Sequence, residues 1–239
     1  MEALPGKRVV IIGGSSGIGL DIARHLLSKG MEVTLASRNV AKLERARRYL
    51  DRPVDIFPLD ASDDNQVKQF FEQLEPFDHL VTTSGTVIKG PLIDLDFSDI
   101  TQTIENKLHS QILATKYGIN KIRAGGSITL FSGAFSQKSF VGTSIMTAIN
   151  CAVEGFAKAL ALEVAPIRVN AISPGYIDTP IRQWNSEEEK IEFFKQVEEK
   201  LPLKRMGVTE DISELVDYLI HSKYTTGTVN YIDGGLSLT

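Results

Sequence analysis

The chain has 239 residues, of which 42% are hydrophobic and 23% are charged, and its 26 basic and 30 acidic side chains give a net charge of -4. This length supports one large α/β domain with a sizeable core, and the lack of a basic excess argues against nucleic acid as a partner. The single cysteine, Cys151, excludes an internal disulfide framework, and the four histidines lack the spacing of metal ligands.

No apolar run approaches the roughly 20 residues that cross a bilayer, and the first residues carry no hydrophobic export segment. A reducing compartment suits a chain with one cysteine. We therefore expect a cytoplasmic protein with no membrane partner and no metal ion.

Short runs of β-branched residues alternate along the chain with longer segments that carry apolar residues at three- and four-residue steps. The expected strands span residues 8–12, 32–36, 54–59, 79–83, 127–131, 167–172 and 228–232. The expected helices span residues 18–29, 39–50, 63–75, 98–122, 144–164, 186–201 and 209–221. Such alternation is typical of β–α–β units on a parallel sheet. The pattern predicts one α/β domain over residues 1–239, with seven strands and helices on both faces.

A glycine-rich segment, GGSSGIG, follows the first expected strand and contains Gly13, Gly17 and Gly19. Glycine allows a positive φ, and its missing β-carbon lets the main chain approach a pyrophosphate at the N-terminus of the next helix. Because the segment lies between a strand and a helix, it predicts a dinucleotide site.

The second expected strand ends in LASRN, where Ser37 and Arg38 replace the carboxylate that a site for NAD usually offers to the ribose hydroxyls. A guanidinium beside a hydroxyl suits a 2′-phosphate, and this segment has no acidic side chain to repel one. We therefore expect NADP(H) to be preferred over NAD(H).

Motifs in the same order along the whole chain resemble the short-chain dehydrogenase/reductase family. GGSSGIG resembles its dinucleotide loop, Asp60-Ala61 its adenine-contacting pair, TTSG (82–85) its NNAG motif, and RVNAISPGYIDT (168–179) its nicotinamide segment. The resemblance implies a Rossmann-type, doubly wound three-layer sandwich around a seven-stranded parallel sheet. It also implies that the cofactor is bound by Gly13, Ser15, Ser16, Gly17, Ile18, Ser37, Arg38, Asp60, Ala61, Ser84, Gly85, Asn150, Pro174, Gly175, Ile177 and Thr179.

The catalytic tetrad of this family is incomplete here. Asn106 resembles the tetrad asparagine, but the flanking motifs put Gly133, Met146 and Asn150 at the positions of the serine, tyrosine and lysine. In the family, the lysine lowers the tyrosine pKa so that the tyrosine exchanges a proton, while the serine binds the substrate oxygen. The resemblance therefore implies an atypical active site without the usual proton relay.

The sequence leaves the replacement proton source open. Candidates are hydroxyls of the loop that faces substrate in the family, a tyrosine and a histidine: Ser132, Ser136, Ser139, Thr143, Ser144, Tyr176 and His109. Each also fits an ordinary structural role, and water or the substrate itself remains an alternative. We expect the substrate pocket to be lined by Ser136, Thr143, Met146, Tyr176 and Trp184. Residues 176–201 are expected to form a lid over this pocket.

The leading interpretation is an NADPH-dependent oxidoreductase that acts on a hydrophobic or conjugated small molecule, such as a carbonyl compound, an enone or a quinone-like ring. Two alternatives stay open. One is an NADPH-binding sensor or scaffold without turnover, and the other is a non-redox dehydratase or cyclase on the same fold. The resemblance also implies self-association, as a dimer or tetramer, through the helices at 98–122 and 144–164.

Overall fold

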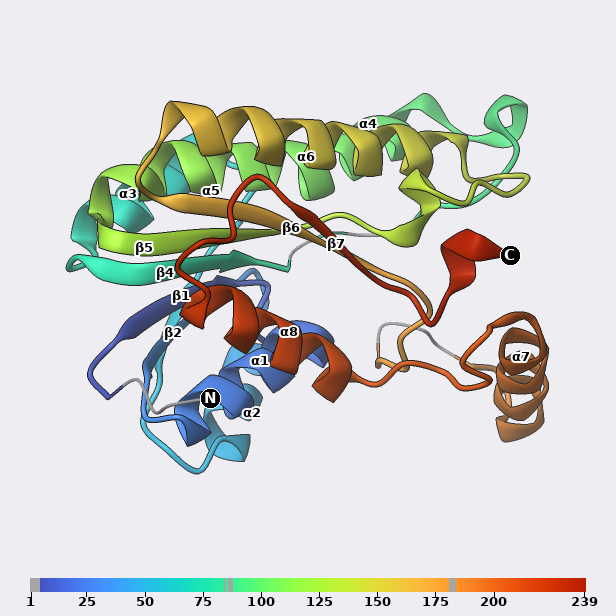
Figure 1. Cartoon of the computed structure of the whole chain (residues 1–239), viewed down its shortest axis with the longest axis horizontal. Helices are drawn as coiled ribbons and strands as arrows, with labels where there is room; N and C mark the ends of the chain where they lie inside the picture. Colours follow the sequence, from blue (N-terminus) through green and yellow to red (C-terminus); the bar gives the residue numbers. More distant parts are fainter. Residues whose placement is uncertain (1–4, 84, 86–87, 181–183) are drawn as a thin grey trace.

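The computed structural model describes residues 5–83, 85, 88–180 and 184–239, and within them seven parallel strands form one sheet with helices on both faces (Figure 1). The strand order is β3-β2-β1-β4-β5-β6-β7, so the winding reverses between β1 and β4. The strands are β1 (Arg8–Ile12), β2 (Glu32–Ser37), β3 (Asp55–Pro58), β4 (Phe77–Thr82), β5 (Ile122–Phe131), β6 (Arg168–Pro174) and β7 (Val229–Ile232). The predicted doubly wound α/β fold is confirmed.

Two helical layers enclose the sheet (Figure 1). One layer consists of α1 (Gly17–Ser28), α2 (Val40–Tyr49) and α8 (Thr209–His221). The other consists of α3 (Asp64–Gln73), α4 (Phe97–Ile104), α5 (Ser110–Gly118) and α6 (Ser144–Glu163). Helix α7 (Glu187–Lys200) lies apart from both layers, beyond one end of the sheet.

The strands are apolar along their whole length because both of their faces are buried. In β1, Val9 and Ile11 belong to the core beneath α1 and α8, whereas Val10 and Ile12 belong to the core beneath α3, α5 and α6. This alternation follows from the two-residue period of a strand. Because helices bury both faces of the sheet, the residues that remain accessible are those that follow the carboxyl ends of the strands.

The predicted helix over residues 98–122 is wrong in one respect, because the structure interrupts it. A π-helical turn, Glu105–His109, separates α4 from α5. Such a turn holds more residues than an α-helical one, so it changes which side chains face the sheet. Strand β5 also begins earlier than expected, at Ile122.

Helix α6 is, within the described part of the chain, the one helix long and apolar enough to span a membrane by length and composition. Its buried residues include Ile149, Val153, Ala157 and Leu160. The last three belong to the core beneath α3, α5 and α6. A buried core helix passes the same test, and α6 covers one face of the sheet.

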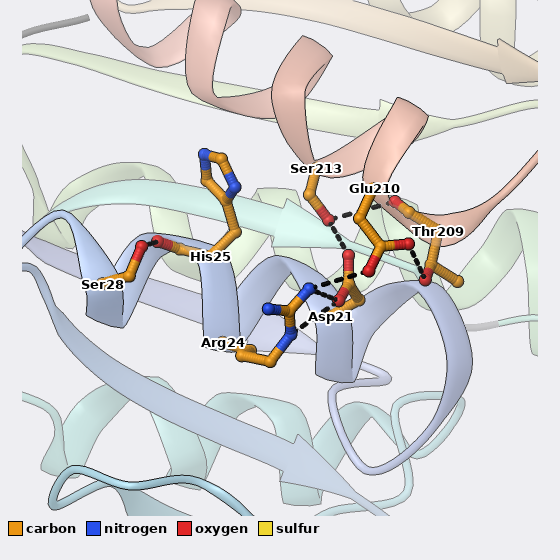
Figure 2. Close-up of polar contacts among 7 residues, drawn as sticks. All are labelled: Asp21, Arg24, His25, Ser28, Thr209, Glu210 and Ser213. Carbon is orange, nitrogen blue, oxygen red and sulfur yellow. Dashed lines mark hydrogen bonds and ion pairs between the residues drawn. The ribbon is translucent and has the colours of Figure 1, made fainter.

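Polar contacts through Asp21 join α1 to α8 (Figure 2). Asp21 Oδ2 accepts a hydrogen bond from Ser213 Oγ at 2.6 Å, and Asp21 Oδ1 accepts one from Arg24 Nε at 2.9 Å. Arg24 also forms an ion pair with Glu210 at 2.9 Å. Ser213 is fully buried. Because Asp21 lies one turn after Gly17, these bonds fix the beginning of α1 against α8.

We expect the substitution Asp21→Ala to lower the free energy of unfolding by about 1–2 kcal/mol, because it removes the acceptor of a buried hydroxyl and the partner of Arg24. Urea unfolding followed by circular dichroism measures this. Glu210→Ala is the matched control, since it removes the exposed ion pair with Arg24 and a 3.3 Å hydrogen bond from Thr209 Oγ1, and it should cost less than about 1 kcal/mol. Equal losses in the two variants would contradict the role given to Asp21.

Candidate functional site

The turn between β1 and α1 requires glycine. Gly13 and Gly17 have φ values of 90° and 53°. A β-carbon on Gly19 would lie 2.6 Å from both Gly13 O and Thr83 Oγ1, which is closer than atoms can pack. Ser16, the N-cap, makes no side-chain capping bond, and the first turn of α1 carries no acidic residue. The N-terminus of α1 therefore suits an anion such as a pyrophosphate.

A cleft of about 270 Å³ opens beside this turn, at the carboxyl ends of β1, β2 and β4. It brings together many of the residues predicted to bind the cofactor: Gly13, Ser15, Ser16, Ile18, Ser37, Arg38, Asp60, Ala61 and Gly85. Gly17 is not in its lining but lies 3.7 Å, measured from its β-carbon position, from Thr179 Cβ. Ser84 lies outside the described residues. The cleft has the place and the lining expected of a dinucleotide site.

One end of the cleft is basic. Ser37 Oγ lies 2.9 Å from Ser15 Oγ, and Arg38 Nη1 donates to Asn106 Oδ1 at 3.1 Å. Lys42, in the first turn of α2, lines the same cleft. Sequence reasoning missed Lys42. The available signal was its position four residues after Arg38, near the start of the predicted helix over residues 39–50. Two cations and two hydroxyls fit a phosphate on the adenine-side ribose.

A second pocket, of about 220 Å³, adjoins the cleft and shares Ile18 with it. Its lining includes the residues aligned with the tetrad serine, tyrosine and lysine and those of the predicted nicotinamide segment: Gly133, Met146, Asn150, Pro174, Gly175, Tyr176, Ile177 and Thr179. Residues that are far apart in the sequence thus meet around one cavity. Met146, which is 2% exposed, gives this cavity an apolar wall.

Asn150 carries an unsatisfied buried group. Its side chain is 1% exposed, and among the described residues Oδ1 has no hydrogen-bond partner. Gly133 lies against it, because a β-carbon there would come within 3.0 Å of Asn150 Nδ2. A buried acceptor of this kind is costly unless a ligand donates to it. The residues therefore fit a hydroxyl-bearing ligand such as the ribose of a nicotinamide dinucleotide.

Lys107 is a pocket residue that sequence reasoning missed. It lines the second pocket, whereas Asn106 lines the cleft and bonds to Arg38. Lys107 Nζ donates to the carbonyl oxygen of Ser132 at 2.9 Å, and burial lowers the pKa of Lys107 to about 8. Asn106, which resembles the tetrad asparagine, thus lines the cleft, while its neighbour Lys107 lines the pocket that contains the other three tetrad positions, so the two neighbours are offset between the two cavities. The π-helical turn Glu105–His109 is the physical reason for this offset.

Gln111 fixes the π-helical turn to the sheet. Its side chain is fully buried, and its Nε2 donates to Lys107 O at 2.8 Å and to Phe131 O at 3.0 Å. Its Oε1 accepts from Phe131 N at 2.9 Å and from Thr82 Oγ1 at 2.8 Å. One amide thus joins Lys107 to the ends of β4 and β5.

Three residues expected in the substrate pocket lie outside its lining. Ser136 Oγ donates to Glu154 Oε1 at 2.5 Å, and Thr143 Oγ1 closes a turn by bonding to the Phe140 main chain. Trp184 packs instead on α7, with its ring centroid 5.3 Å from that of Phe193. These local partners keep the three side chains away from the cavity.

The expected lid contains α7, and Tyr176 links it to the pocket. The Tyr176 ring lies 5.8 Å from the Phe193 ring, and Lys190 of α7 forms an ion pair with Asp178 at 3.6 Å. Residues 181–183 of the expected lid lie outside the described residues. His109, another proposed proton source, is exposed and lines neither cavity.

Comparisons with known proteins show what the chain is similar to. The family model described as enoyl-(acyl carrier protein) reductase matches residues 13–237. The chain is 31% identical to the 3-oxoacyl-[acyl-carrier-protein] reductase of Mus musculus, with 98% of this chain and 99% of the relative covered. It is 30% identical to the short-chain dehydrogenase/reductase ATR9 of Stachybotrys chlorohalonatus, with both chains covered in full.

Solved structures of similar proteins also match over nearly the whole chain. The crystal structure of a small-chain dehydrogenase in complex with NADPH is 34% identical, with a TM-score of 0.86 and coverage of 98% of this chain and 100% of that one. A short-chain dehydrogenase/reductase from Serratia marcescens BCRC 10948 is 26% identical, with a TM-score of 0.90 and coverage of 99% and 100%.

We expect Gln111→Leu to lower the free energy of unfolding by more than about 2 kcal/mol, because several buried main-chain groups lose their partner. Urea unfolding measures the loss. Gln102→Leu is the matched control, since Gln102 is exposed on α4 and its replacement should cost no more than about 0.5 kcal/mol. A stable Gln111 variant would show that the turn does not need this amide.

Proposed function

The chain belongs to the short-chain dehydrogenase/reductase family, and we propose that it is an NADPH-dependent reductase of a hydrophobic or conjugated small molecule. The observation that carries the proposal is the pairing of two adjoining cavities. One is a cleft with a basic end, and the other is an apolar pocket with a buried acceptor, Asn150 Oδ1. A long ligand with a phosphate at one end and a sugar near the other suits both.

The choice of NADPH over NADH rests on charge. Ser37, Arg38 and Lys42 line the cleft where a 2′-phosphate would lie, and Asn106 Oδ1 accepts a hydrogen bond from the Arg38 guanidinium. The carboxylate of Asp60 is already bound by Ser62, whose main-chain N and Oγ donate to it. A 2′-phosphate would therefore meet two cations at this end of the cleft.

The reacting end is assigned to the second pocket. Here Asn150 would bind a ribose hydroxyl, while Pro174, Ile177 and Thr179 would hold the nicotinamide end. When bound, the cofactor supplies a hydride. The residues aligned with the usual serine and tyrosine are Gly133 and Met146, so neither position offers a hydroxyl to the substrate.

The substrate class follows from the same lining. Met146, Phe135 and Leu236 present an apolar surface, which suits an aromatic or alkyl substrate face. Holding a donor and an acceptor in contact contributes up to about 7–11 kcal/mol to lowering a barrier, more than one positioned acid does. A conjugated acceptor such as an enone or a quinone-like ring depends least on a positioned acid from the protein, and this is the substrate class we favour.

A second candidate function is an NADPH-binding sensor or scaffold without turnover. The absence of the serine, tyrosine and lysine at residues 133, 146 and 150 favours it. The two functions differ in one measurable respect, because a sensor binds the reduced dinucleotide without ever oxidising it.

We expect Arg38→Asp to weaken NADPH binding by at least about tenfold while changing NADH binding far less, because only NADPH carries the 2′-phosphate. Isothermal titration calorimetry with both dinucleotides measures this. The control is Arg52→Asp, an equal charge change at an exposed loop residue outside the cleft lining. Equal weakening of NADPH and NADH by Arg38→Asp would refute the phosphate assignment.

We expect the protein to oxidise NADPH in the presence of enones or quinones faster than in the presence of simple ketones. Loss of absorbance at 340 nm, with product identified by mass spectrometry, measures the reaction. Tight NADPH binding with no oxidation by any of the three classes would instead support the sensor, and product without net NADPH loss would support non-redox chemistry.

A further inference from the structure

Lys107 is a charged group in an otherwise neutral pocket. Among the described residues that line the second pocket, it is the only one with a charged side chain. Gly133, Asn150 and the apolar Met146 line the same pocket. In the described part of the chain no carboxylate lies within ion-pair distance of Lys107 Nζ. A lone cation in such a pocket favours a ligand that carries, or develops, negative charge.

The Lys107 side chain is held in place from both ends. Its Nζ donates to Ser132 O at 2.9 Å, which leaves two of its three N–H groups for other acceptors. Its stem passes Gly85, where a β-carbon would come within 3.2 Å of Lys107 Cγ. Its main-chain carbonyl accepts from Gln111 at 2.8 Å. The ammonium therefore points into the pocket on a fixed stem.

We propose that Lys107 is the proton donor of this pocket and delivers the proton of its ammonium group to the oxygen of a substrate bound against Met146. The inference rests on the proposed function. The atoms balance as in any reduction by a dihydronicotinamide: the substrate carbon gains a hydride, the substrate oxygen gains the Lys107 proton, the dinucleotide becomes oxidised and Lys107 becomes neutral. Lys107 is then recharged by a proton from solvent.

The titration of Lys107 suits this role. With a pKa near 8, set by burial, the ammonium is the main form at neutral pH yet gives up its proton more easily than an exposed lysine. The neutral amine takes over as the pH rises through 8. We therefore expect the rate of reduction to fall above about pH 8.

Other titratable groups face this region and need controls. From α6, Glu154 accepts from Ser132 Oγ at 2.6 Å, behind the carbonyl that Lys107 contacts. From β7, Tyr231 lies 3.4 Å from Glu154, and burial raises the Tyr231 pKa, so it stays neutral in this range. Tyr176 lines the pocket, His109 and Glu105 share the π-helical turn, and Cys151 is exposed next to Ser136 O.

A first test needs no substrate. The oxidised nicotinamide ring is positive and the reduced one is neutral, so a nearby ammonium should disfavour NADP+ alone. In the wild-type protein, we expect the preference for NADPH over NADP+, measured by calorimetry, to fall at least about threefold between pH 7 and pH 9. In Lys107→Met the preference should be the same at both pH values.

Two variants serve as controls for this test. Lys116→Met makes the same change on α5 at an exposed side chain outside both cavities, and Cys151→Ser removes the exposed thiol. Both should keep the wild-type pH dependence. A pH dependence that persists in Lys107→Met would overturn the proposal, whereas failure of the wild type to bind either dinucleotide would overturn the proposed function itself.

A second test uses turnover with an enone or quinone. Lys107→Met should reduce kcat about 10²–10⁴-fold, with NADPH affinity retained. Lys107→Arg keeps the charge but holds its proton, so it should lose a similar factor and lose the fall above pH 8. Full activity in Lys107→Arg would reduce the role of Lys107 to electrostatics and reject proton transfer. Lys107→Arg also serves if Lys107→Met does not fold.

Discussion

The whole structure depends on the parallel alignment of the strands, which gathers their carboxyl ends at one edge of the sheet. The winding reverses between β1 and β4, so the connections after these two strands leave in opposite directions and open a crevice between them. The glycine turn after β1 and the ends of β4, β5 and β6 then border two neighbouring cavities, both lined by Ile18. No single side chain creates this site, because the topology already places its parts together.

Gln111 fixes the π-helical turn Glu105–His109 to the end of β5. Its buried amide satisfies the end of β5 and the carbonyl of Lys107 at once, so the π-helical turn cannot shift without breaking bonds in the core. A buried network in which every member is satisfied resists rearrangement more than separate bonds do. The position of Lys107 thus depends in part on Gln111, a residue that lines neither cavity.

The sequence was sufficient to predict the fold and the cleft, because hydrophobic period and the glycine turn are local signals. Arg38 and the segment from Pro174 to Thr179 follow strands that the pattern locates well, and the structure brings them to the expected cavities. Lys107 was missed because a π-helical turn leaves no clear local signature, and one extra residue in the turn changes the face that each side chain takes. Ser136 and Thr143 were misplaced because their partners, Glu154 and the Phe140 main chain, are known only from the packed structure.

The acceptor that holds the Lys107 ammonium is a main-chain carbonyl, that of Ser132, and every amino acid supplies the same atom there. The side chain of residue 132 can therefore change without removing the acceptor that holds the cation. A substitution there can alter what the loop presents to a ligand while the ammonium keeps its acceptor, so specificity becomes separable from reactivity.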